Sequence, residues 1–97
     1  MKSKINHQRM PTTPGEILSE EFLKPMNITQ KELADHIRVD IKVINRLVKG
    51  RTSLSAEMAL KLSATFSTTA NFWLNSQMAV DIYLARKAIA KLPAALI

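Results

Sequence analysis

At 97 residues, the chain has room for one domain whose hydrophobic core can hold without covalent cross-links. It has no cysteine, which excludes disulfides and thiolate metal sites and favours a cytoplasmic location. Its low content of glycine (two) and proline (four) favours helices over a β architecture with many turns. The net charge of +6 suits a polyanionic partner, whereas Met1–His7 lacks the apolar run of a signal peptide and Leu62–Val80 is too polar to span a membrane.

The first part of the chain predicts an arm followed by a helix. Residues 1–13 are polar and form an expected extended, poorly ordered arm, which leaves 14–97 as a single domain. We expect the first helix to run from Pro14 to Lys24. Proline suits the first turn of a helix, Glu16 favours its positive dipole end, and Pro25 is expected to end it.

The second predicted helix has a clear start signal. Thr29 followed three residues later by Glu32 is a capping box, in which each side chain bonds the other residue's backbone N–H. Apolar residues then recur on one face up to Ile37. The pattern breaks at Arg38–Asp40, where Asp40 can cap the next helix.

The third predicted helix runs from Ile41 to about Lys49 and stops at Gly50. Its apolar residues are spaced for one buried face, so the opposite face carries basic and amide side chains. Between Arg38 and Arg51 the chain has five cations and a single acid, Asp40, which is the charge pattern of a surface that meets phosphates.

Two further helices complete an all-α, five-helix bundle. Ser55 caps the fourth, and Thr68 or Thr69 caps a fifth that could continue to Lys91. The fifth helix is apolar on more than one face, so it needs two partners, and we expect a second copy of the chain to be one of them. The residues expected at this dimer interface are Phe72, Trp73, Gln77, Val80, Asp81 and Leu84.

Two short helices joined by a three-residue turn, with polar side chains outward on the second, are typical of a helix-turn-helix, whose second helix reads the major groove of DNA. The string Thr29–Ala34 with Ile44, Leu47 and Gly50 resembles the Cro and phage-repressor family. Further matches at residues 14–18, 55–62 and 72–77 make residues 11–85 similar to the HigA-type antitoxins, which are also called virulence-associated protein I-like.

This resemblance implies a dimer joined through its C-terminal helix that represses its own toxin–antitoxin operon at a palindromic operator. It also implies a HigB-type partner, a small mRNA-cleaving toxin. Gln30 matches an amide that touches phosphate, while Ile41, Lys42 and Arg46 match positions that reach base edges. The residues expected to contact DNA are Gln30, Lys31, Ile41, Lys42, Val43, Asn45, Arg46, Lys49, Arg51 and Thr52.

The chain departs from the family pattern at three positions. Arg38 replaces the usual turn glycine and must adopt a positive φ or reshape the turn. Ser67 stands where a helix-ending glycine is common. Ile41 is apolar where many relatives carry an amide, which favours contact with a thymine methyl group.

Other functions are open at this point. A stand-alone dimeric repressor without a toxin partner is the main alternative. An enzyme is a remote option because no arrangement of Ser, His and Asp suggests catalysis, and a general RNA-binding module is disfavoured because the few aromatic residues have packing spacing. His7 and His36 have no metal-ligand spacing, so we expect neither a metal nor another cofactor.

Overall fold

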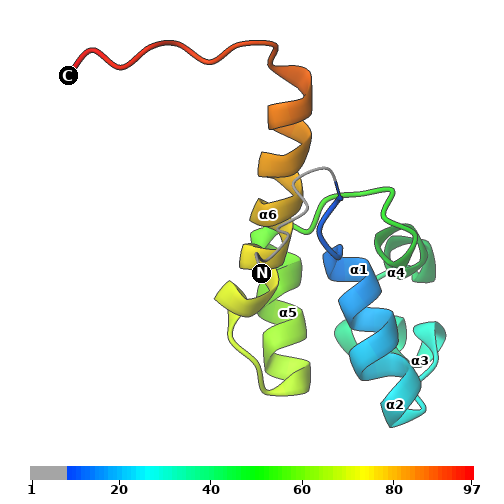
Figure 1. The fold of residues 1–97 in the computed structure, drawn as a ribbon. Helices are drawn as coiled ribbons and strands as arrows, with labels where there is room; N and C mark the ends of the chain where they lie inside the picture. Colours follow the sequence, from blue (N-terminus) through cyan, green and yellow to red (C-terminus); the bar gives the residue numbers. More distant parts are fainter. Residues whose placement is uncertain (1–8) are drawn as a thin grey trace, which may run out of the picture.

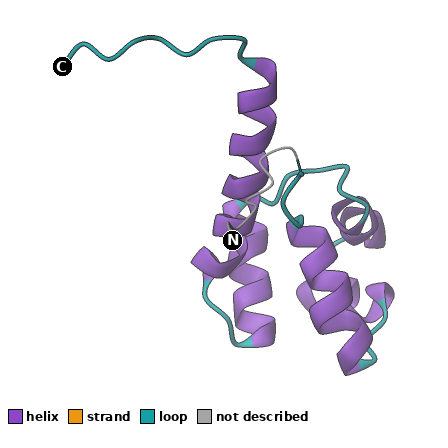
Figure 2. Ribbon diagram, viewed as in Figure 1, coloured by secondary structure: helices purple, strands orange, loops and turns teal. Residues whose placement is uncertain are grey.

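The computed structural model describes residues 9–97, and within them the chain forms five helices and no strand (Figures 1 and 2). The predicted all-α fold is therefore confirmed. None of the described helices is both long enough and apolar enough to cross a bilayer.

The first helix is a continuous rod made of α1 (Pro14–Ile17), a wide π-helical turn (Leu18–Leu23) and α2 (Lys24–Met26). The prediction that Pro25 ends it is wrong, because the rod continues to Met26 and ends at Asn27, whose φ is 58°. A proline inside a helix lacks an N–H and collides with the carbonyl four residues earlier. Here the backbone N–H of Lys24 bonds to Ser19 O, five residues back, and this wider register opens the helix beside Pro25.

The helix-turn-helix consists of α3 (Gln30–Ile37) and α4 (Ile41–Val48). The capping box of Thr29 and Glu32 and the Asp40 cap are both confirmed. Arg38 takes a left-handed conformation with φ 61°, and Val39 N–H donates to Ala34 O at 3.0 Å. The turn thus keeps the shape that a glycine would give it, at the cost of placing a β-carbon in the left-handed region.

The C-terminal half consists of α5 (Ala56–Phe66) and α6 (Ala70–Ala88), which lie side by side (Figure 1). Ser55 caps α5 as predicted, and of the two candidates for α6 the cap is Thr69. The last helix ends at Ala88, short of the expected Lys91, and residues 89–97 run away from the bundle without helix or strand (Figure 1).

The core lies where the five helices meet. Its completely or almost completely buried large side chains come from every helix: Leu18, Leu33, Ile44, Leu62 and Trp73. Each such side chain contributes roughly 1.5–3 kcal/mol to folding by leaving water. The centres of the Trp73 and Phe22 rings lie 5.2 Å apart. The Trp73 Nε1–H donates to Thr68 Oγ1 at 2.7 Å, so the polar group of this buried ring is hydrogen-bonded.

The last two residues of the expected arm, Thr12 and Thr13, contact the bundle. Thr13 is the N-cap of α1 and forms a second capping box with Glu16, and its side chain is almost buried. The Ser76 hydroxyl of α6 donates to Thr12 O at 3.2 Å. Residues 12 and 13 are therefore attached to the bundle, while residues 1–8 of the expected arm lie outside the described part of the chain.

Candidate nucleic-acid interface

Helix α4 is positioned by an unusually close approach of α1. A β-carbon on Gly15 would lie 1.8 Å from Leu47 O and 2.9 Å from Val48 Cα, so only glycine fits between the two backbones. Ile44 and Leu47 anchor the same helix in the core. This packing fixes which face of α4 points outward.

The outward face of α4 is mixed in chemistry. Ile41 and Val43 are 44% and 38% exposed. Lys42, Arg46 and Lys49 are exposed around them. Apolar groups beside cations suit the major groove, where thymine methyl groups lie beside acceptor atoms of the bases.

Among residues 9–97, no acid forms an ion pair with the cations of α4 or of the loop after it. Within residues 9–97 the three ion pairs lie on other segments, at Glu20–Lys24, Lys31–Asp35 and Glu57–Lys61. Asp40, the one acid between Arg38 and Arg51, is engaged with the Lys42 backbone N–H at 2.8 Å as the cap of α4. The positive charge on this face is therefore not neutralised by the described part of the chain itself.

An amide pair joins the two helices of the motif. Asn45 Nδ2 donates to Gln30 Oε1 at 3.3 Å, and both side chains are half-buried. Gln30 thereby keeps its own amide N–H groups free to donate outward from the start of α3. Lys31, which we also expect at DNA, instead reaches Asp35 at 3.1 Å in an exposed ion pair of small energetic value.

Gly50 ends α4 and begins the loop that follows it. Gly50 has φ 71°, Gly50 N–H donates to Leu47 O, and Arg51 N–H donates to Arg46 O, which together form a Schellman motif. This geometry places Arg51 and Thr52 directly beside the last turn of α4, and both are exposed. The structure thus brings the ten predicted DNA-contacting residues onto α3, α4 and this adjoining loop.

Five of the six residues expected at a dimer interface, all but Phe72, lie on one face of α6, and at Trp73 and Val80 this face is turned toward the chain's own core. Trp73 is completely buried and Val80 is 6% exposed, so both belong to the core of a single chain. Gln77 is half-buried and bonds to Leu54 N–H and to Asp81. Phe72 and Leu84 are 41% and 51% exposed. Residue spacing identifies this face as largely apolar, but it cannot tell whether the chain's own helices or a second copy covers it.

The face of α6 opposite the core carries a different set of apolar residues. Met78, Ile82 and Ala85 are exposed, the first two at 55% and 46%, and Ile89, which follows the last residue of the helix, is 48% exposed. Their spacing of four, three and four residues is that of a coiled-coil seam. We call Met78, Ile82, Ala85 and Ile89 the α6 seam. Its heptad spacing is visible in the sequence and is the signal that could have found it.

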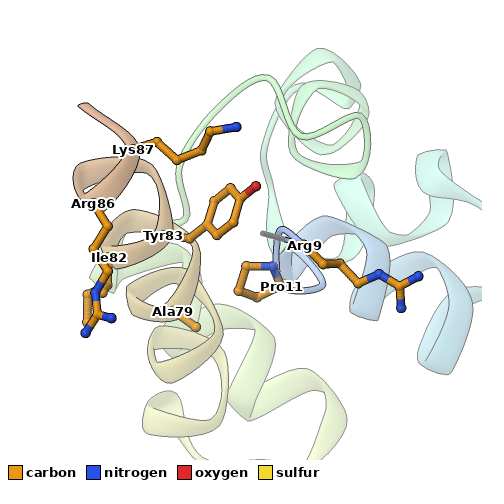
Figure 3. A pocket seen from close by; sticks show the side chains of 7 residues that line it. All are labelled: Arg9, Pro11, Ala79, Ile82, Tyr83, Arg86 and Lys87. Carbon is orange, nitrogen blue, oxygen red and sulfur yellow. The ribbon is translucent and has the colours of Figure 1, made fainter. Parts of the chain in front are cut away.

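A groove of 420 Å³ lies on another side of α6 (Figure 3). Arg9 and Pro11 form one side, and Ile82, Tyr83 and Lys87 are among the residues on the other (Figure 3). Lys87 Nζ lies 5.5 Å from the centre of the Tyr83 ring, a cation–π distance. The groove shares no residue with the predicted DNA-contacting set.

Comparison with known proteins agrees with this arrangement. A helix-turn-helix family model matches residues 20–73, more than half of the chain. The antitoxin HigA-1 of Vibrio cholerae is 43% identical over 79 residues, which cover 81% of this chain and 74% of that protein. The Escherichia coli YbaQ protein, named as an uncharacterised helix-turn-helix-type transcriptional regulator, is also 43% identical, and the match covers 77% of this chain but only 66% of YbaQ.

Among solved structures, the antitoxin HigA of Pseudomonas aeruginosa with the higBA promoter superposes with a TM-score of 0.82. It is 34% identical in sequence, and the match covers 90% of this chain and 99% of that one. The likeness therefore includes α6 as well as the helix-turn-helix.

Proposed function

Because this chain belongs to the Cro-type helix-turn-helix family and, within it, to the HigA-type antitoxins, we propose that it binds double-stranded operator DNA and represses its own toxin–antitoxin operon. The observation that carries this proposal is the outward face of α4, where cations with no acidic partner among the described residues surround exposed apolar side chains. DNA in a bacterium lies in the cytoplasm, which is where the protein would act.

Helix α4 enters the major groove in this proposal. Arg46 and Lys42 reach base edges or flanking phosphates, and Ile41 packs on thymine methyl groups. Gln30 donates to a phosphate at the start of α3, where the helix dipole favours an anion. Arg51 and Thr52 contact the backbone on the other side of the recognition helix.

A homodimer formed through the α6 seam would present two copies of α4. Burying Met78, Ile82 and Ile89 against a second copy removes exposed apolar surface that one chain leaves in water. Two-fold symmetry then requires a palindromic operator, whose half-sites are separated by the distance between the two α4 helices.

Neutralisation of a small mRNA-cleaving toxin of the HigB type is the second activity that we propose. It is supported by the identity to HigA-1 and by the presence of surfaces outside the DNA-contacting set, including the groove between Arg9 and α6 (Figure 3). A stand-alone dimeric repressor remains the alternative. The two differ in one outcome, which is the rescue of cells that express the toxin encoded beside this gene.

The experiment that tests DNA binding is titration of the operon's upstream region across a salt series. The Lys42→Ala, Arg46→Ala double variant should bind at least tenfold more weakly, since each base contact that it removes is worth about 1–3 kcal/mol. The control is Lys24→Ala, Lys61→Ala, which removes the same charge from two surface ion pairs. Equal binding by both double variants would show that α4 is not the recognition helix.

The same variants test the second activity by growth rescue. If the toxin binds elsewhere, the Lys42→Ala, Arg46→Ala protein should lose operator binding and still rescue cells that express the adjacent toxin. Loss of both activities in a folded protein would mean that one surface serves both. Failure of the wild-type protein to rescue would favour the stand-alone repressor.

A further inference from the structure

The side chain of Gln77 connects α6 to the loop after α4. Its Oε1 accepts a hydrogen bond from the Leu54 backbone N–H at 2.8 Å, and its Nε2 donates to Asp81 Oδ1 at 2.9 Å. Asp81 lies one turn further along α6, so it orients the amide and leaves the oxygen facing the loop. Gln77 is half-buried, which shields the bond to Leu54 from water.

The loop has few other attachments. Its upstream end is fixed by the bond from Arg51 N–H to Arg46 O. Among the described residues, no backbone–backbone hydrogen bond holds Thr52, Ser53 or Leu54. The Leu54 side chain is buried in the core, and its N–H bond to Gln77 is the polar anchor at the downstream end.

A small cavity of 130 Å³ lies between this loop and α6, lined in part by Thr52, Ser53 and Gln77. The loop therefore has room to move toward α6 if the amide no longer holds Leu54 in place. Arg51 and Thr52, which lie between the two anchors, would move with it.

We infer that Gln77 is a positioning residue for binding to the DNA backbone: by holding Leu54 it fixes where Arg51 and Thr52 meet phosphates. This inference rests on the proposed DNA binding and extends it to a residue that does not touch DNA. It also links the helix that carries the α6 seam to the phosphate-contacting loop through a single side chain.

The first test replaces Gln77 with leucine, which has a similar size and neither hydrogen-bonding group. The variant should remain helical, yet bind the operator roughly tenfold more weakly, as expected when one charge-assisted bond to a phosphate is broken. The slope of log K against log salt should become less steep by about 0.9 for each phosphate that the protein no longer neutralises. Ser76→Ala is the control, because it removes a neighbouring α6 hydrogen bond, to Thr12 O, that does not reach the loop.

The second test restores the network with its polarity exchanged. Gln77→Glu alone keeps an acceptor for Leu54 N–H but faces the like charge of Asp81, so it should also weaken binding. Gln77→Glu combined with Asp81→Asn has the same net charge as the wild type, and the new amide can donate to the new carboxylate. This double variant should recover the wild-type affinity and salt slope.

The outcomes separate this inference from the function on which it rests. Wild-type protein that does not bind the upstream DNA refutes the proposed function itself. If the wild type binds and Gln77→Leu shows the same affinity and salt slope, only the positioning role of Gln77 is overturned. Weaker operator binding by Gln77→Leu with an unchanged salt slope also overturns it, and so does a Gln77→Glu, Asp81→Asn variant that fails to recover the wild-type affinity. A general loss of stability would explain either result.

Discussion

Replacing Gly15 with alanine should destabilise the protein more than the same replacement at its other glycine, Gly50. The new β-carbon would lie 1.8 Å from Leu47 O, 2.6 Å from Leu47 C and 2.9 Å from Val48 Cα. All three are backbone atoms of α4, so no side chain can rotate away to make room. The two helices would have to separate.

The size of the effect follows from that geometry. Restoring an ordinary contact distance of 3.4 Å to Leu47 O would require α1 and α4 to move apart by about 1.6 Å. Overpacking a tight core costs about 1–3 kcal/mol even when side chains can adjust. Because only backbone atoms lie near the new β-carbon, we expect Gly15→Ala to lower the free energy of unfolding by about 3 kcal/mol or more. That is a large part of the free energy of unfolding of a typical domain, which is about 5–15 kcal/mol.

Urea denaturation followed by circular dichroism measures this loss, and titration with operator DNA measures the consequence for α4. Gly50→Ala is the matched control, because a β-carbon there meets nothing within 4 Å and the only cost is a φ of 71°. That strain is about 1–2 kcal/mol and is offset in part by the lower entropy of the unfolded alanine chain. We therefore expect Gly50→Ala to lower the free energy of unfolding by about 1 kcal/mol.

Wild-type stability and affinity in Gly15→Ala, or a smaller destabilisation than in Gly50→Ala, would contradict so close an approach of α1 to α4. Weakened operator binding by the destabilised Gly15→Ala protein would show that α4 has also moved from its position.

Three further predictions test other features. Ser67→Gly should raise stability by up to about 1 kcal/mol in thermal or urea unfolding, because Ser67 has φ 56° at the end of α5; no gain would mean that its β-carbon is not strained. Thr29→Ala should cost about 1 kcal/mol, because it removes one side of the α3 capping box, and an unchanged unfolding midpoint would contradict this. Ile82→Asp should give a folded monomer in sedimentation equilibrium, whereas Leu84→Asp, at a similarly exposed position on the other side of the same helix, should remain dimeric. A dimeric Ile82→Asp would exclude the α6 seam as the interface.

Helix starts are predictable from the sequence because each cap is a short-range interaction. Thr29, Asp40 and Ser55 can all be identified from residues at most three positions away, and each accepts the expected backbone hydrogen bond. Thr13 escapes prediction because the prolines near it suggest an arm. Pro25 misleads for a related reason, since its effect depends on a backbone register that the sequence does not display.

The faces of α6 are harder to predict because they depend on which neighbours arrive. Trp73 and Val80 are as apolar as Ile82, yet only the first two lie against the rest of the chain. The α4 face is easier, because its two buried positions, Ile44 and Leu47, leave one outward face on so short a helix. The Gln77–Leu54 bond cannot be foreseen, since it joins positions 23 residues apart through tertiary packing.

The five caps also bear on how fast the chain folds. Every helix begins at a side chain that bonds its own first turn: Thr13, Thr29, Asp40, Ser55 and Thr69. Each helix start is thus specified by residues close in sequence, and neighbouring helices are joined by short segments. Helical proteins with such local contacts fold in microseconds to milliseconds. A chain released from a ribosome or from a denatured state would therefore display a formed α4 long before a second copy could diffuse to its α6 seam.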